Sequence, residues 1–383
     1  MGRMLLARVL VVIGALLAVV ALLAGYIRYQ ALDNSTVEDT AGQLIADDAI
    51  RDQVAASLVD ELFNNVDVEA VLDQRLPEQQ KGLAGPIAGA VRMGAEPVAD
   101  RLLERPRIQE LWVRSVTQAH RALINVLEGK TREGVETEGG NVVLNLRPLI
   151  LQFGDRIAII GNIGNRLPPD AGRITIIKSD QLETAQDATQ LLKVLGLWLW
   201  VVPIALWAIA LWLARGRRRA IMRMIGISAV VGGLLVLVVR RLAGSYIVDD
   251  LSPAESVKVA ASHAWEILTS ALRDGGLTLL FLGVVMLIAV WLIGPSRSGT
   301  ATRRWLAPFI ARWEIAFGAV AGIMLLLVWW GPVIQSRQWR AVIAGAIVLA
   351  IGVELLRRET RKEFPNAEMA DSRAAIGQLF RRG

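Results

Sequence analysis

Two histidines and no cysteine among 383 residues restrict the chemistry that the side chains of this chain can perform. Without cysteine there is no thiol nucleophile, no thiolate metal ligand and no disulfide. His120 and His263 are far apart in the sequence, and neither belongs to the His-Glu-x-x-His pattern of a zinc site. We therefore expect no metal, cofactor or catalytic site.

Each histidine has a simpler structural interpretation. His120 shares a helical face with Trp112 and other apolar residues, which predicts a hydrogen-bonded histidine in a core. His263 stands next but one to Trp265, and we interpret it as a residue near the membrane interface.

Paired carboxylates occur at Asp47-Asp48 and at Asp249-Asp250. Either pair can bind a divalent cation, but a helix cap or a solvated helix face explains them equally well. Asn34-Ser35-Thr36 fits the glycosylation pattern and equally a helix cap, with Ser35 and Glu38 at capping-box spacing. No nucleophile elbow, phosphate-binding loop or dinucleotide fingerprint is present. We expect a protein that is not an enzyme.

The elements that carry these residues include long apolar runs. The hydrophobic fraction of 54% and the mean hydropathy of +0.43 are high for a soluble protein. Six runs are about 20 residues long, the length of a membrane-spanning helix. They lie near 5–27, 194–214, 220–239, 276–294, 314–334 and 339–356. The first, within 1–27, fits a retained signal anchor better than a cleaved signal peptide.

Basic residues are grouped beside these runs and predict an orientation. The groups are Arg3 and Arg8; Arg215, Arg217, Arg218, Arg219 and Arg223; Arg297, Arg303, Arg304 and Arg312; and Arg357, Arg358, Arg361 and Lys362. Basic loops stay in the cytoplasm, and all four groups do so only with six spans and both termini cytoplasmic. The isoelectric point near 10.0 therefore reflects membrane topology, and we expect no nucleic acid partner.

This topology divides the chain into regions. A signal anchor at 1–27 precedes an acidic extracytoplasmic domain at 28–192, and a five-helix transmembrane region follows at 193–356. That region contains an outer helical loop at 240–275, and 357–383 is a basic cytoplasmic tail. The expected localisation is the plasma membrane.

The predicted fold class is mainly α. Helical periodicity dominates 28–192, with a helix expected over about 96–105 and another starting at Pro106. The charged, glycine-rich run 131–140 is expected to be an exposed loop. The segments 142–146 and 174–177 are rich in β-branched residues and predict a small two-stranded β-ribbon. From Ser179 or Asp180 a helix is expected to continue unbroken into the second span. Such a helix would couple the outer domain to the membrane.

Small residues at a spacing of four predict packing faces in three spans. The pairs are Ser228 and Gly232, Gly318 and Gly322, and Ala341 and Gly345. The segments 180–239 and 253–334 also show a weak similarity, and parallel repeats of this kind occur in transporters.

The chain resembles the uncharacterised multi-pass integral membrane proteins of actinobacteria that carry a helical extracytoplasmic domain. The likeness covers most of 1–240. It is carried by Trp112 and His120 eight residues apart, VVLNL at 142–146, LPPDAGRITI at 167–176 and the Arg-Gly-Arg-Arg-Arg turn at 215–219. The resemblance implies a location and a general plan, and it carries no activity.

Three functions remain open. The first is a non-enzymatic envelope protein that binds, senses or scaffolds through its outer domain, with the lipid bilayer and an envelope protein or cell-wall component as partners. The alternative is a transporter or channel component, which the lack of ionisable residues at the centre of the spans disfavours. An envelope enzyme ranks third, because no catalytic motif supports it.

Overall fold

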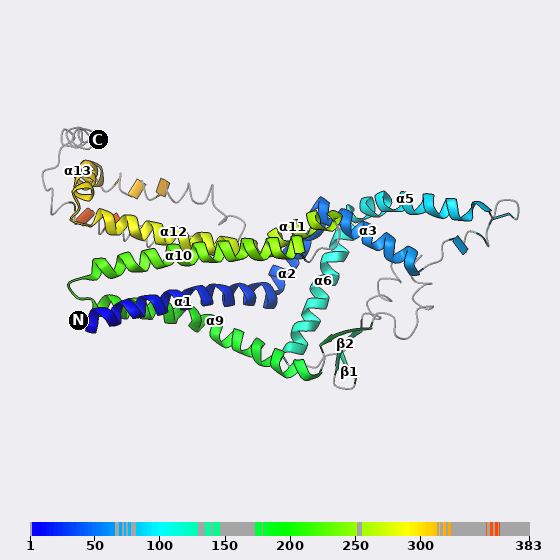
Figure 1. Cartoon of the computed structure of the whole chain (residues 1–383), viewed down its shortest axis with the longest axis horizontal. Coiled ribbons are helices and arrows are strands. Elements are labelled where there is room, and N and C mark those ends of the chain that lie inside the picture. Colours follow the sequence, from blue (N-terminus) through cyan, green and yellow to red (C-terminus); the bar gives the residue numbers. More distant parts are fainter. Residues whose placement is uncertain are drawn as a thin grey trace. The chain divides into compact units, whose positions relative to one another are not determined.

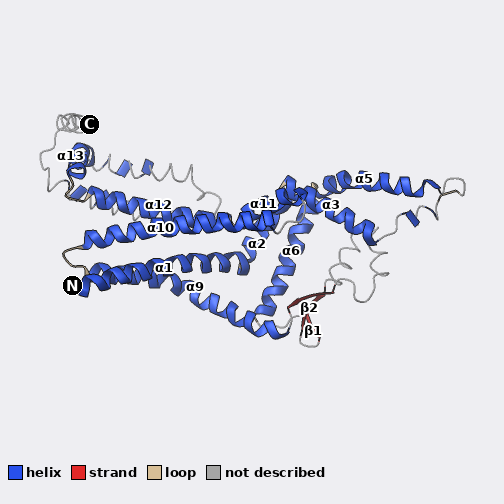
Figure 2. Ribbon diagram, viewed as in Figure 1, coloured by secondary structure: helices blue, strands red, loops and turns tan. Residues whose placement is uncertain are grey.

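Helices make up nearly all of the described protein, with one small sheet (Figure 2). The computed structural model describes residues 2–65, 82–128, 135–138, 141–145, 173–177, 179–250 and 255–311, with scattered residues elsewhere. The helices in the N-terminal half are α1 (Gly2–Leu32), α2 (Asn34–Ala46), α3 (Asp48–Asn65), α5 (Ala84–Leu103) and α6 (Pro106–Leu127). Those that follow are α9 (Ser179–Leu213), α10 (Arg218–Ser245), the π-helical turn η2 (Tyr246–Asp250), α11 (Glu255–Leu268), α12 (Ser270–Leu292) and α13 (Arg297–Ala311).

The chain forms two compact units, each built from separate stretches of sequence. Unit 1 comprises Met1–Val19, Val202–Leu237 and Asp274–Gly383. Unit 2 comprises Val20–Val201 and Val238–Arg273. The segment between α10 and α12 therefore belongs to the same unit as the long insert that follows α1.

The prediction of six membrane spans is wrong. Within the described residues three helices are long and apolar enough to cross a membrane: α1, α10 with η2 (Arg218–Asp250), and α12 (Figure 1). A shorter apolar helical stretch, Leu199–Leu213, lies at the end of α9. The expected spans near 314–334 and 339–356 fall almost entirely outside the described residues.

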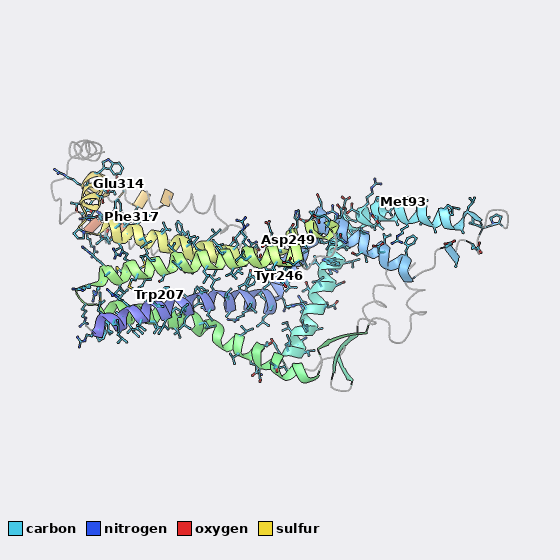
Figure 3. The ribbon with its side chains drawn as sticks, viewed as in Figure 1. Met93, Trp207, Tyr246, Asp249, Glu314 and Phe317 are labelled. Carbon is cyan, nitrogen blue, oxygen red and sulfur yellow. The ribbon has the colours of Figure 1, made fainter. Side chains whose placement is uncertain are left out.

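Unit 1 is a helical bundle with an apolar core. Its buried residues come from three segments: Ala7 and Val11 of α1, Ala210 and Ala214 at the end of α9, and Ile221 and Ile225 of α10. The indole Nε1 of Trp207 donates to the carbonyl of Val11 at 3.3 Å (Figure 3). Gly14 leaves room for that ring, because a Cβ there would lie 2.6 Å from Trp207 Nε1. These contacts place α1 and the end of α9 antiparallel.

Two pairs of glycines let α10 and α12 approach backbone to backbone. A Cβ on Gly233 would lie 2.7 Å from the carbonyl oxygen of Gly276, and a Cβ on Gly283 would lie 2.8 Å from that of Gly226. Within each helix the two glycines are seven residues apart, Gly226 and Gly233 in α10 and Gly276 and Gly283 in α12. Seven residues are two helical turns, so the two glycines of a helix lie on the same face. Small residues that permit such close approach are a common packing device in membrane helices.

The small-residue pairs predicted at a spacing of four contribute less to the packing between helices. Gly232 faces the side chains of Val19 and Leu279, while the Ser228 hydroxyl donates to Ile225 O in its own helix. In the described part of the chain no atom lies within 4 Å of a Cβ placed on Gly318 or Gly322. Ala341 and Gly345 lie outside the described residues.

Helix α13 is attached to the end of α12 by a buried arginine. Arg303 donates through Nη1 to the carbonyls of Leu292 and Gly294, the second at 2.9 Å. These carbonyls have no partner in the helix itself, and a basic side chain stabilises them. The sequence had predicted only a basic loop here.

In unit 2 the helices α2 and α3 lie in the region where helices are predicted, but the N-cap of α2 is not the predicted residue. A break at Asp47 separates α2 from α3, so of the interpretations of Asp47-Asp48 the helix cap applies to Asp47. The N-cap of α2 is Asp33, whose carboxylate accepts from the Ser35 and Thr36 amides. The capping box predicted at Ser35 is therefore wrong, since a carboxylate two residues earlier satisfies two amides at once. These bonds, led by that of the Ser35 side chain, lower the pKa of Asp33.

Helices α5 and α6 complete the helical part of unit 2. The predicted start of α6 at Pro106 is confirmed, whereas α5 begins at Ala84, well before the expected 96. Helix α2 packs antiparallel on α6, because Gly42 faces Val113 while Ile45 lies in one cluster with Ile108 and Trp112.

The described strands form a three-stranded antiparallel sheet in the order β1-β2-β3. The strands are β1 (Val135–Glu138), β2 (Asn141–Asn145) and β3 (Arg173–Ile177). The predicted two-stranded ribbon is therefore wrong. Strand β1 lies in a charged, glycine-flanked stretch that the sequence had indicated as an exposed loop, and pairing with β2 supplies hydrogen bonds that its side chains do not predict.

Candidate functional site

The junction between α2 and α3 gathers the charged side chains of unit 2. Asp47 stands at the break, and its Oδ1 accepts from the Ile50 amide at 3.2 Å, which caps the start of α3. The same carboxylate is bound from far along the chain by His263 of α11, with Nδ1 2.9 Å from Oδ2 and 3.0 Å from Oδ1. Asp47 thus joins three helices.

The environment of Asp47 favours its ionised form. Partial burial acts to raise the pKa of this carboxyl, but the hydrogen bond from His263 and those from the Ile50 and Ala49 amides prevail and lower it. The ionised carboxylate is therefore the form in which Asp47 accepts these hydrogen bonds.

Arg51, one turn into α3, neutralises the neighbouring acids. Its side chain is only 9% exposed, and Nε donates to Asp100 Oδ1 of α5 at 2.8 Å. Nη2 donates to Asp48 Oδ1 at 2.8 Å and lies 3.4 Å from Glu104 Oε1. Burial acts to lower the pKa of Arg51, but the bonds to Asp100 and Asp48 raise it above its ordinary value. The guanidinium therefore holds α3 and α5 together as a permanent cation.

This cluster is arranged for holding helices together. The adjacent carboxylates Asp47 and Asp48, considered as cation ligands in the sequence, have different partners, His263 and Arg51. Among the described residues no group of three or more histidine and acidic side chains is close enough to hold a metal ion.

His120 lies on the face of α6 that also carries Val113 and Thr117, by helical spacing. Its Nε2 is buried, and within the described segments it has no hydrogen-bond partner. The residue as a whole is half-buried, so the expected core position is met only by this nitrogen, and within the described residues the expected hydrogen bond is not found there. Burial lowers the pKa of His120, so the neutral ring is the favoured form.

The other candidates from the sequence lie apart from this cluster. Asp249 and Asp250 belong to η2 (Figure 3). Sequence reasoning placed His263 at the membrane interface and missed its contact with Asp47, which is 216 positions away. It also missed the three partners of Arg51. No local pattern reports such contacts, because each depends on how separate helices meet.

Comparison with protein-family models, with curated proteins and with solved structures finds no match to this chain.

Proposed function

We propose that this chain is a non-enzymatic, multi-pass plasma-membrane protein that binds an envelope component through unit 2, with unit 1 embedded in the bilayer. The observation that carries the proposal is the His263–Asp47 contact. Helix α11 is joined by the chain to two candidate spans, α10 with η2 and α12, and this contact makes it part of the unit that contains the insert. A partner that binds unit 2 therefore acts on the segment between two spans, as sensing or scaffolding requires.

The orientation of the proposed anchor follows from charge. In the described segments of unit 1 at 2–19, 202–237 and 274–311 the only acidic residue is Asp274, in the first turns of α12. Their arginines stand near the start of α1, around the α9–α10 turn, and from the end of α12 into α13. The positive-inside rule favours a cytoplasmic position for this basic end. Unit 2 then lies outside the cytoplasm.

The proposed binding surface is helix α5, which exposes apolar side chains. Val91 and Val98 are seven residues apart and lie on one face, and Met93, which is 77% exposed, lies on another (Figure 3). Exposed apolar side chains in a group mark contact surfaces for proteins more often than for carbohydrates, which need hydrogen-bonding groups. We therefore favour an envelope protein over a cell-wall polymer as the partner.

Cysteine labelling tests the orientation, and the cysteine-free parent provides the background. Met93→Cys on α5 and Ser298→Cys on α13 both replace exposed residues. In intact cells a membrane-impermeant maleimide should label the first variant only, and the second should react after permeabilisation. Labelling of Ser298→Cys in intact cells would overturn the orientation.

Photo-crosslinking tests the binding function in the full-length protein. A photoreactive amino acid at Met93 should give a discrete adduct with one envelope protein, while the same group at Ser298 should not. The transporter alternative predicts the opposite pair of results, namely no adduct at Met93 and solute movement by the protein reconstituted in liposomes.

A further inference from the structure

We propose that one end of unit 1 is a binding surface for the headgroups of anionic phospholipids. This arginine surface comprises the start of α1, the turn between α9 and α10, and the first turns of α10 (Figure 1). Its arginines are Arg3, Arg8, Arg215, Arg217, Arg218, Arg219 and Arg223. The inference rests on the proposed membrane insertion of unit 1, and it goes further by naming the class of lipid that the anchor selects.

An apolar cluster brings the three segments of the arginine surface together. Its buried residues include Ala7 of α1, Ala214 at the turn and Ile221 of α10. Each of these is followed within two positions by an arginine, namely Arg8, Arg215 and Arg223. Arginines that are more than 200 positions apart in the sequence are therefore neighbours in the fold.

The side chains of the arginine surface are accessible to a ligand. All seven arginines are exposed, and among the described residues none of them has a carboxylate partner. Arg215 instead lies over the ring of Trp212, with 5.0 Å between its guanidinium carbon and the ring centroid. This differs from Arg51 of unit 2, whose buried guanidinium is already bound by Asp48 and Asp100.

The described helices of unit 1 carry little negative charge to balance these arginines. Asp274, the only acidic residue of the segments named above, stands two positions before Gly276, and Gly276 faces Gly233. Gly233 lies ten residues along α10 from Arg223. At 1.5 Å per residue this is about 15 Å, well beyond the screening length of about 8 Å at physiological ionic strength.

Repulsion within the arginine surface favours an anion from outside the chain. Arg219 and Arg223 are four residues apart and lie on one side of α10. Like charges at this spacing destabilise a helix. An anion bound between or beside the two guanidinium groups removes that penalty, and a phosphate matches the paired N–H donors of arginine.

Exposed apolar side chains beside the arginines indicate a lipid as the source of the phosphate. Leu5 and Leu6 stand between Arg3 and Arg8 and are exposed, and Trp212 below Arg215 is 59% exposed. A soluble polyanion would contact the charges and leave these apolar groups in water. A phospholipid contacts both, through its headgroup and its acyl chains. Anionic headgroups are favoured over phosphatidylcholine, because choline neutralises its own phosphate.

Fluorescence quenching in bilayers tests the arginine surface with the full-length protein. A cysteine at exposed position 220, introduced as Ala220→Cys into the cysteine-free chain, carries a fluorophore. The bilayers are phosphatidylcholine with a small fraction of one quencher lipid, which is either phosphatidylglycerol or phosphatidylcholine with a nitroxide on the acyl chain near the headgroup. We expect stronger quenching by the labelled phosphatidylglycerol, because it gathers at the arginines.

Two double variants on this labelled background show whether the arginines cause the preference. Arg219→Gln with Arg223→Gln should weaken the preference for phosphatidylglycerol by about fivefold for each arginine removed. The five arginines that remain keep the charge that orients the anchor. Since a repulsive pair is lost, thermal unfolding in a neutral detergent should show this variant to be at least as stable as the parent. The matched control is Arg101→Gln with Arg105→Gln, which removes two exposed arginines of unit 2 and should keep the preference.

The quenching results separate this proposal from the proposed function. Equal quenching by the two labelled lipids in the parent would overturn the headgroup surface and leave membrane insertion intact. An absence of quenching by either lipid would overturn both, because the start of α10 would then lie away from the bilayer. The headgroup surface is also overturned if both double variants lose the preference equally or if neither loses it.

Discussion

The backbone contact between α10 and α12 predicts that two adjacent glycines respond differently to replacement by alanine. Gly232 and Gly233 have the same helical environment, so replacement by alanine brings the same gain in helix propensity, about 0.5–1 kcal/mol. Their neighbours differ. A Cβ on Gly233 would lie 2.7 Å from both the Gly276 carbonyl oxygen and the Leu280 amide, whereas on Gly232 it would meet Val19 and Leu279 methyl groups at 3.1 and 3.4 Å.

The size of the difference in unfolding free energy depends on whether the atoms that meet the new Cβ can move. Ordinary contact begins near 3.4 Å, so Gly233→Ala requires the two backbones to separate by roughly 0.7 Å, which weakens dispersion contacts along the interface. Overpacking of this kind costs about 1–3 kcal/mol, more than the gain in propensity. In Gly232→Ala rotation of a valine and a leucine side chain relieves the contact. We therefore expect the free energy of unfolding to be lower in Gly233→Ala than in Gly232→Ala by about 1–3 kcal/mol.

Thermal unfolding in detergent, followed by the fluorescence of the 12 tryptophans, measures this difference. Gly283→Ala should behave like Gly233→Ala, since its Cβ would also meet backbone atoms. If Gly233→Ala unfolds at the same temperature as Gly232→Ala or higher, α10 and α12 are not packed through these glycines.

Three further predictions concern unit 2. Arg51→Ala should destabilise the protein by about 2–4 kcal/mol in denaturant unfolding, because it leaves a partly buried Asp100 unpaired, whereas the exposed pair of Arg92 with Asp60 should contribute under about 1 kcal/mol. Equal effects of Arg51→Ala and Arg92→Ala would contradict the assignment of a buried network. The lowered pKa of Asp47 means that its ionisation stabilises the fold above the ordinary value of 3.8, and that this stability is lost as the pH falls through the lower folded value. Asp47→Asn should therefore be less stable than the parent at neutral pH, and titration of Tm should show the gap closing in that acid range. His120 has a lowered pKa, so the parent should lose stability as the pH falls below 6.5, and His120→Phe should lack that part of the pH profile. An unchanged profile would show that His120 is not buried.

Local features of unit 2 were predictable because they depend on nearby residues. The start of α6 at Pro106 and the break at Asp47 follow from backbone preferences and capping. The continuous helix from Ser179 is likewise present as α9. The number of spans was not predictable in the same way, since an apolar run indicates burial and leaves open whether a helix is long enough to cross a membrane.

The sequence by itself determined that the chain is mainly helical, that several helices are strongly apolar and that arginine is concentrated beside them. Each of these properties is written in composition and in a periodicity of a few residues. Only the tertiary structure decided that Asp47 binds His263, that Arg51 has three acidic partners, and that glycines seven apart carry the α10–α12 contact. These depend on which distant segments meet, and a single sequence records no such pairing because the same side chain fits many partners until packing selects one.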